Sequence, residues 1–214
     1  MKVDGIYAGK IQVFGESGQP SAIQKDKISS AVVNETGIVT DEQADLRYHG
    51  GVEKALHQFS QRSYDIITAE FPELIGKAVS GSIGENLTSL LMDETNVHIG
   101  DIYAIGDVRL QVSEPRVPCW KIDERFKVTG VSKFIADNGL NGWYFRVLTP
   151  GEFNINDRIT LEKRLNDTFS LADFFKVTVK RNPSRDELLL LSGLDGLSEQ
   201  WKARIGTRLK SLSE

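Results

Sequence analysis

Short apolar stretches that alternate with polar residues, separated by glycine turns, dominate the first 163 residues. Apolar side chains occupy every second position at 108–113, which is typical of a strand with one buried face. The segment 155–161 repeats this pattern, and Gly-Asp pairs at 100–101 and 106–107 are typical of turns. Many short strands at this spacing predict a closed or partly closed β-barrel.

One helix is predicted within this region, at 61–71. Ser60 suits the N-cap position, because its hydroxyl can accept a hydrogen bond from the first helical turn. The pair Phe71-Pro72 ends the helix, because proline disfavours the helical conformation of the residue before it.

The pattern changes after about residue 165. Ser170, followed by Asp173 three residues later, is typical of the start of a helix. The break at 182–184 precedes a leucine-rich helix that extends to about Leu191. The sequence therefore predicts two short helices with a tight connection.

Ser198 is expected to begin a third helix. Three apolar residues of this helix recur every four positions on one face: Trp201, Ile205 and Leu209. We therefore predict a small three-helix domain at 166–214 after a β-barrel domain at 1–165.

The composition excludes several classes of protein. The net charge of −4 does not favour nucleic acid as a partner. No apolar run approaches the about 20 residues of a membrane helix, and the first residues do not resemble a secretory signal. A single cysteine fits a reducing compartment. We therefore expect a cytoplasmic protein with no membrane partner.

The last predicted helix is basic, which leaves one alternative open. Its cations are Lys202, Arg204, Arg208 and Lys210. Three compact helices ending in a basic one also occur in helix-turn-helix readers of DNA. We favour a solvated face, because cations are common near helix C-termini.

Cys119 is the only cysteine, and it lies in the segment Glu-Pro-Arg-Val-Pro-Cys-Trp-Lys at 114–121. The two prolines of this segment fix two backbone angles and stiffen the loop. Arg116 and Lys121 are close in sequence, and cations favour the thiolate. A thiolate is both a nucleophile and a soft metal ligand, whereas a free cysteine is often only a small buried apolar residue. Both interpretations stay open from the local sequence.

A second candidate site lies between Arg47 and His57. Gly50-Gly51 permits positive φ angles, and successive N–H groups in such a turn can bind an anion. Arg47 and Lys54 would add positive charge beside it. The alternative, an ordinary Gly-Gly turn, is favoured for this motif by itself.

The three histidines raise the question of a zinc site with Cys119. They are His49, His57 and His98. Their spacings match none of the usual zinc patterns, so we do not expect zinc.

Taken together and in order, four segments resemble the MOSC family, named for the C-terminal domain of molybdenum cofactor sulfurases. They are His49-Gly50-Gly51 with Lys54-Ala55, Gly84-Glu85-Asn86-Leu87, Gly100-Asp101, and Pro115-Arg116 followed by Pro118-Cys119. The opening segment Tyr7-Ala-Gly-Lys-Ile and the helical tail resemble the YiiM branch of this family. The likeness covers essentially the whole chain and is strongest at 37–121.

The resemblance implies a mainly β fold, a MOSC-type β-barrel with one or more short helices, plus a small C-terminal three-helix domain. It implies that Cys119 is catalytic and ligates the molybdenum of a pterin-based molybdenum cofactor. The residues implied to bind this cofactor are Arg47, His49, Gly50, Gly51, Lys54, Asn86, Arg116 and Cys119.

The resemblance also implies an activity. Related proteins reduce N-hydroxylated compounds, including hydroxylated purine bases such as 6-hydroxylaminopurine, which is a detoxification. The chain has no flavin, haem or iron–sulfur motif, so we expect an external electron-donor protein. We also consider a homodimer, because small relatives commonly dimerise.

Three other functions stay open at this point. The protein could carry the molybdenum cofactor without turnover, or Cys119 could carry persulfide sulfur without a metal. A regulator whose tail contacts nucleic acid is the least favoured, because residues 180–214 are only weakly basic.

Overall fold

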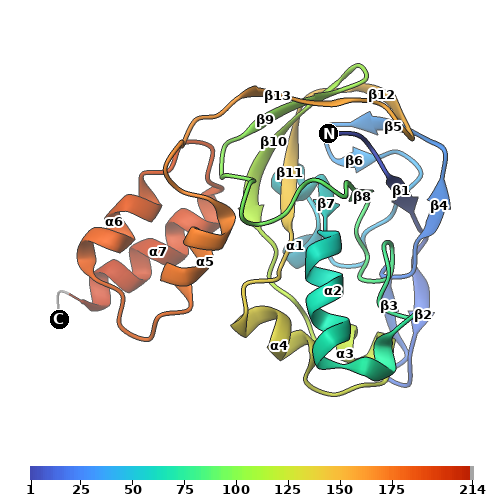
Figure 1. Ribbon diagram of the computed structural model, residues 1–214, viewed down its shortest axis with the longest axis horizontal. Helices are drawn as coiled ribbons and strands as arrows, with labels where there is room; N and C mark the ends of the chain where they lie inside the picture. Colours follow the sequence, from blue (N-terminus) through green and yellow to red (C-terminus); the bar gives the residue numbers. More distant parts are fainter. Residues whose placement is uncertain (213–214) are drawn as a thin grey trace.

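An eight-stranded mixed sheet forms the centre of the fold (Figure 1). The computed structural model describes residues 1–212, and for Arg47 and Tyr48 only the backbone. The strands of this sheet are β1 (Gly5–Ala8), β4 (Asp26–Ile28), β7 (Leu56–Gln58), β8 (Leu87–Thr88), β9 (Ile102–Ile105), β10 (Val108–Pro115), β11 (Trp143–Thr149) and β13 (Ile159–Lys163). Their order is β13-β9-β10-β11-β7-β8-β1-β4.

The sheet curves into a half-barrel. Its neighbouring strands are antiparallel except for β7 and β8, which are parallel. The edge strands β13 and β4 do not pair with each other among the described residues. The half-barrel therefore corrects the expectation of a closed barrel and agrees with a partly closed one.

Two small sheets complete the β structure. One contains β12 (Gly151–Asn154), β5 (Ser30–Asn34) and β6 (Gly37–Ile38), and the other contains β2 (Gln12–Phe14) and β3 (Gln19–Ser21). The strand predicted at 155–161 begins only at Ile159, so this prediction was wrong for its first half. Asn156 has a φ of 72°, and Asp157 N–H donates to the Asn154 carbonyl at 3.1 Å. The start of the alternating pattern is therefore a turn.

The predicted strand and turns upstream are confirmed. The segment 108–113 lies within β10. Gly100 and Gly106 have φ angles of 82° and 54°, which side chains with a Cβ rarely adopt.

The helix predicted at 61–71 is confirmed as α2 (Gln61–Glu70). Ser60 caps it by accepting a hydrogen bond from Ser63 N–H at 3.1 Å, and Phe71 is the C-cap. The sequence patterns did not predict several shorter helices: α1 (Leu46–His49), η1 (Val52–Lys54), η2 (Pro72–Leu74), α3 (Lys121–Phe126) and α4 (Val131–Asp137). These elements have one or two turns, too few for a periodic apolar pattern.

The three helices predicted in the tail are also present, grouped at one side of the molecule (Figure 1). They are α5 (Leu171–Thr178), α6 (Arg185–Ser192) and α7 (Glu199–Ser211). Ser170 and Ser198 are their predicted N-caps, and Ser170 forms a capping box with Asp173. Ile205 of α7 is buried.

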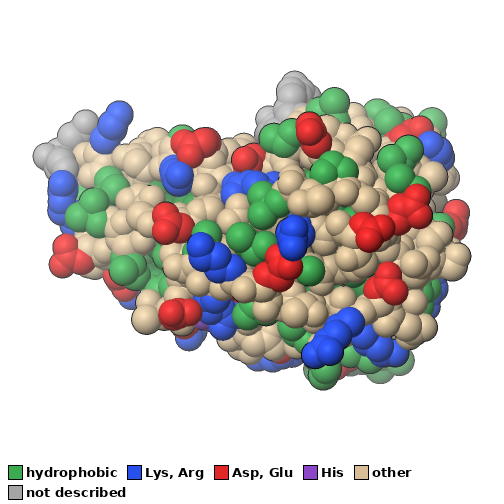
Figure 2. All heavy atoms as spheres, turned by 90° about the horizontal axis from the view of Figure 1, so that it is seen from above, with side chains coloured by type: hydrophobic (Ala, Val, Ile, Leu, Met, Phe, Trp, Pro, Cys, Tyr) green, Lys and Arg blue, Asp and Glu red, His purple; other side chains and the backbone are tan. Residues whose placement is uncertain are grey.

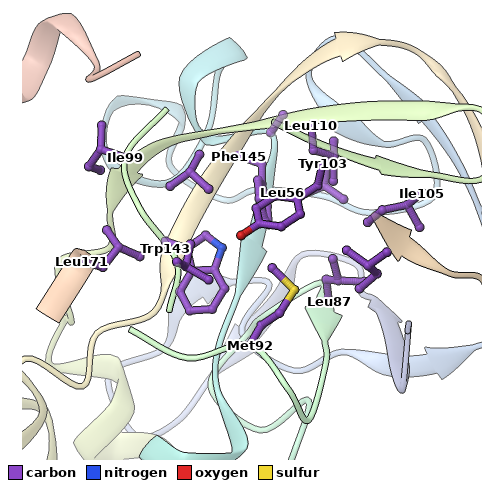
Figure 3. Packing of buried hydrophobic residues seen from close by; sticks show 14 of the residues in the cluster. Leu56, Leu87, Met92, Ile99, Tyr103, Ile105, Leu110, Trp143, Phe145 and Leu171 are labelled. Atoms are coloured by element: carbon purple, nitrogen blue, oxygen red, sulfur yellow. The ribbon is translucent and has the colours of Figure 1, made fainter. Parts of the chain in front are cut away.

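The tail packs against the sheet through a shared hydrophobic cluster. Leu171 of α5 belongs to the same cluster as Trp143 and Phe145 of β11 (Figure 3). Leu171 N–H also donates to the Val97 carbonyl at 2.8 Å, and Ser198 N–H donates to the Ser113 carbonyl at 2.9 Å. The division into domains at 1–165 and 166–214 stays a prediction.

A second hydrophobic cluster joins α2, α3 and α4. Its members include Phe59, Tyr64, Ile67, Ile122 and Ile135. Because Ile122 lies in the first turn of α3, three residues after Cys119, this packing holds the segment that contains the cysteine.

The surface has mixed charge. On the face seen in Figure 2, acidic and basic side chains of the described residues are interspersed, as is typical of a solvated surface. None of the helices within residues 1–212 is both long and apolar enough to cross a membrane.

Candidate functional site

A cavity opens beside the carboxyl end of β10, and we call it the inner cavity. Its free space, including the open mouth, is about 620 Å³. Five of the residues predicted from the sequence line it: His49, Lys54, Asn86, Arg116 and Cys119. The fold therefore brings together side chains from segments that are up to 70 positions apart in the chain.

The remaining predicted residues are placed differently. Gly50 and Gly51 form the turn between α1 and η1 and are not among the lining residues. Gly51 has a φ of 91°, so the turn requires glycine there. Their role as anion donors stays a prediction. The side chain of Arg47 lies outside the described part of the chain.

Cys119 is half-buried and lies where the inner cavity meets a second one. This outer cavity has about 1060 Å³ of free space, including its mouth. The Cys119 carbonyl accepts a hydrogen bond from Ile122 N–H at 3.1 Å, and Lys121 Nζ donates to the Pro20 carbonyl at 2.8 Å. These contacts hold the cysteine at the junction of the two cavities.

Arg116 is a buried cation with unused hydrogen-bonding capacity. The residue is only 4% exposed, and its Nη2 donates to the Ile83 carbonyl at 3.3 Å. Nε and Nη1 have no partner, and no ion pair to Arg116 occurs among the described side chains. A buried guanidinium without a counterion is costly, so this geometry favours an anionic ligand.

The carbonyl that Arg116 contacts is held in place by Glu85. The buried Glu85 carboxylate accepts hydrogen bonds from the Tyr64 hydroxyl at 2.6 Å and from Ile83 N–H at 3.2 Å. Burial raises the pKa of Glu85. Gly84 has a φ of 86°, so the turn between Ile83 and Glu85 also needs glycine. The Gly-Glu-Asn-Leu segment therefore builds a rigid edge of the cavity.

Asn86 lines the inner cavity, but its amide is engaged within the protein. Nδ2 donates to Asp41 at 2.8 Å and to the Tyr7 carbonyl at 3.2 Å, while Oδ1 accepts from His57 N–H at 3.1 Å. Asp41 in turn forms a buried ion pair with Lys25. The sequence reasoning missed Lys25 and Asp41, because no local pattern links two residues 16 positions apart.

The two histidines of the inner cavity are neutral at pH 7. Burial, with the charges of Arg116 and Lys121, lowers the pKa of His49 to about 4. Burial also holds the pKa of His57 well below its ordinary value, and its Nε2 has no partner among the described groups. His49 Nδ1 lies 3.4 Å from the Tyr144 hydroxyl.

The third histidine lies elsewhere. His98 Nδ1 is 2.6 Å from the carbonyl oxygen of Asn166. No group of three or more His, Cys, Asp or Glu side chains in the described part of the chain is arranged to hold a metal ion.

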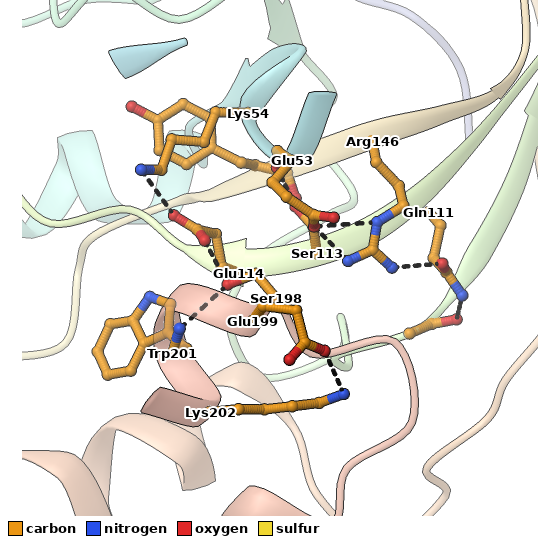
Figure 4. A network of polar contacts seen from close by, with 12 residues as sticks. Glu53, Lys54, Gln111, Ser113, Glu114, Arg146, Ser198, Glu199, Trp201 and Lys202 are labelled. Carbon is orange, nitrogen blue, oxygen red and sulfur yellow. Dashed lines mark hydrogen bonds and ion pairs between the residues drawn. The ribbon is translucent and has the colours of Figure 1, made fainter. Parts of the chain in front are cut away.

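Lys54 connects the site to the helical tail. Its Nζ donates to Gln200 Oε1 at 2.7 Å and lies 3.5 Å from Glu114 Oε1. Ser198, the N-cap of α7, donates to the other oxygen of Glu114 (Figure 4). Burial raises the pKa of Glu114. Sequence reasoning did not predict that the tail contributes to this site, because nothing in the tail's own pattern points to Lys54.

Residues 45–160 match the model of the MOSC domain family, so the chain belongs to that family. Within it, the chain is 31% identical to the protein YiiM of Escherichia coli K12, over 97% of this chain and 95% of YiiM. The predicted resemblance is thereby confirmed.

A solved structure confirms the fold. The crystal structure of YiiM from Geobacillus stearothermophilus matches with a TM-score of 0.80 and 25% identity, over 97% of this chain and 98% of that one. A protein of Gibberella moniliformis named "Reductase" is 38% identical over 84% of this chain. The match covers only 32% of that relative's length.

Proposed function

We propose that this protein binds a pterin-based molybdenum cofactor in the inner cavity and reduces N-hydroxylated compounds, such as N-hydroxylated purine bases. The observation that carries the proposal is the buried guanidinium of Arg116, with two unpartnered nitrogens, in the same cavity as Cys119. Membership of the MOSC family and the relative named as a reductase support it.

The residues present fit the chemistry of such a cofactor. Molybdenum favours sulfur ligands, and Cys119 offers a thiol at the wall of the cavity. The cofactor's phosphate needs cations, and Arg116 and Lys54 line the same space. When bound, the cofactor would supply the two-electron chemistry that converts R–NHOH to R–NH2 and water, with two protons.

The protein's own residues would orient the reacting groups. The neutral ring of His49 beside the Tyr144 hydroxyl can hydrogen-bond a substrate without adding charge. Lys54, held by Glu114 and Gln200, places its amino group at the junction of the two cavities. The electrons would come from an external electron-donor protein.

An activity measurement tests this proposal. Protein produced in cells that synthesise the cofactor is given 6-hydroxylaminopurine and an artificial one-electron donor, and formation of the aminopurine is followed. We expect turnover by the wild type, a loss of about 100-fold or more in Cys119→Ser, and no change in the surface variant Lys210→Ala.

Two results would contradict the proposed reduction. Protein that contains molybdenum but reduces no N-hydroxylated compound would indicate a carrier of the cofactor. Protein without molybdenum but with sulfane sulfur on Cys119 would indicate a persulfide carrier.

A further inference from the structure

The outer cavity shares six lining residues with the inner cavity and has seven that the inner cavity lacks. One wall is formed by the loop around the cysteine, with Val117, Pro118 and Trp120. A second wall is formed by α7, with Gln200 and Arg204. The helical tail therefore supplies part of a chamber that ends at Cys119.

Trp120 offers a flat apolar surface in this chamber. The residue is 48% exposed, although large apolar side chains are usually buried, and Lys121 Nζ lies 5.9 Å from the centre of its ring. The Trp120 carbonyl accepts a hydrogen bond from Glu124 N–H at 3.3 Å, which fixes the residue at the start of α3. An exposed indole held in a cavity is suited to stacking against a planar ring.

The α7 wall is polar and offers hydrogen-bond donors. Oε1 of Gln200 is occupied by Lys54, so the amide NH2 group is the part of this side chain left to donate. The Arg204 guanidinium lies 5.2 Å from the Trp201 ring, which orients it. Such donors bind the ring nitrogens and oxygens of heterocyclic bases.

We propose that the outer cavity is the substrate chamber and that it selects planar N-hydroxylated heterocycles. Trp120 stacks on the ring, and Gln200 and Arg204 bind its polar edge, so that the N-hydroxyl group points toward Cys119. This inference rests on the function proposed above and adds the place where the substrate binds. The tail then determines substrate specificity.

Binding of 6-hydroxylaminopurine by equilibrium dialysis tests the chamber, with molybdenum content measured on the same samples. We expect the dissociation constant to rise about ten-fold or more in Trp120→Ala and in Arg204→Ala. Trp120→Phe should restore most of the affinity, because the benzene ring still stacks. Lys202→Ala is the matched control on α7, since it removes one positive charge outside the cavity, where Lys202 pairs with Glu199.

Molybdenum content should be the same in all these variants, and the substrate KM should rise while kcat is retained. Unchanged base binding in Trp120→Ala and Arg204→Ala, or no binding by the wild type, would overturn the chamber even if reduction is observed. Protein without molybdenum that still binds the base through Trp120 and Arg204 would overturn the proposed function and leave the chamber standing.

Discussion

Asn86 donates a 2.8 Å hydrogen bond from Nδ2 to the carboxylate of Asp41 at the wall of the inner cavity. Its other amide contacts, to the Tyr7 carbonyl and from His57 N–H, are also made within the protein. Arg116, in the same cavity, has two nitrogens without partners. The amide of Asn86 is therefore used within the protein, whereas two nitrogens of Arg116 stay available for the anionic ligand that we propose.

Replacing Asn86 with alanine should destabilise the protein. The change leaves buried partners of Asn86 without hydrogen bonds, and we expect the free energy of unfolding to fall by about 2–4 kcal/mol. Urea unfolding of the variant and the wild type measures this difference in stability. The exposed Asn182→Ala is the control and should change stability by less than about 0.5 kcal/mol. Equal effects of the two substitutions would contradict a structural role for Asn86.

Replacing Arg116 with methionine should affect cofactor binding and leave stability intact. Removing a buried, unpaired charge should leave the cofactor-free protein as stable as the wild type, or more stable by about 1 kcal/mol. The variant should retain much less cofactor, because a charge-assisted contact is typically worth about 1.5–3 kcal/mol.

Arg164→Met is the matched control for this substitution. Arg164 pairs with the fully buried Asp101 at 2.7 Å, so its loss should cost about 3 kcal/mol of stability. If Arg116→Met destabilises the protein as much as Arg164→Met does, Arg116 is a structural residue.

His49 predicts a pH dependence of stability. Its pKa is about 4 in the folded protein and near 6.5 in the unfolded chain. Below pH 6.5 the unfolded chain therefore binds a proton that the folded protein does not, and stability falls as the pH is lowered toward 4. Between pH 7 and pH 5 this group should remove about 2 kcal/mol.

The variant His49→Asn isolates this contribution. Urea unfolding at both pH values should show a smaller loss of stability in the variant than in the wild type. His57 stays in both proteins, and its depressed pKa acts in the same direction. Identical pH dependence in the two proteins would show that His49 is freely protonated in the fold.

Capped helices were the part of the fold that the sequence predicted well. Ser60, Ser170 and Ser198 each precede an apolar periodic segment, and each is an N-cap in the structure. Caps and helical periodicity are local properties, so the sequence records them directly. The closure of the sheet depends instead on how distant edge strands meet, and the alternating pattern cannot specify that.

The candidate site also has a part that the local sequence predicts and a part that only the fold brings together. Cys119 and Arg116 share one stiff segment, and both line the inner cavity. Lys25 with Asp41, and Lys54 with Gln200, are brought together only by the fold. The pair Lys54 and Gln200 is 146 positions apart, so no spacing rule could have found it.

The molybdenum and pterin content of the purified protein tests the central claim most directly. The wild-type protein and its Cys119→Ser variant are produced in cells that synthesise the cofactor. The folding of both is checked by circular dichroism. We predict about one molybdenum atom per wild-type chain and a large loss of metal in the variant, because serine is a harder and less acidic ligand than cysteine. A well-folded Cys119→Ser protein with the molybdenum content of the wild type, or a wild type that contains neither metal nor pterin, would contradict the claim.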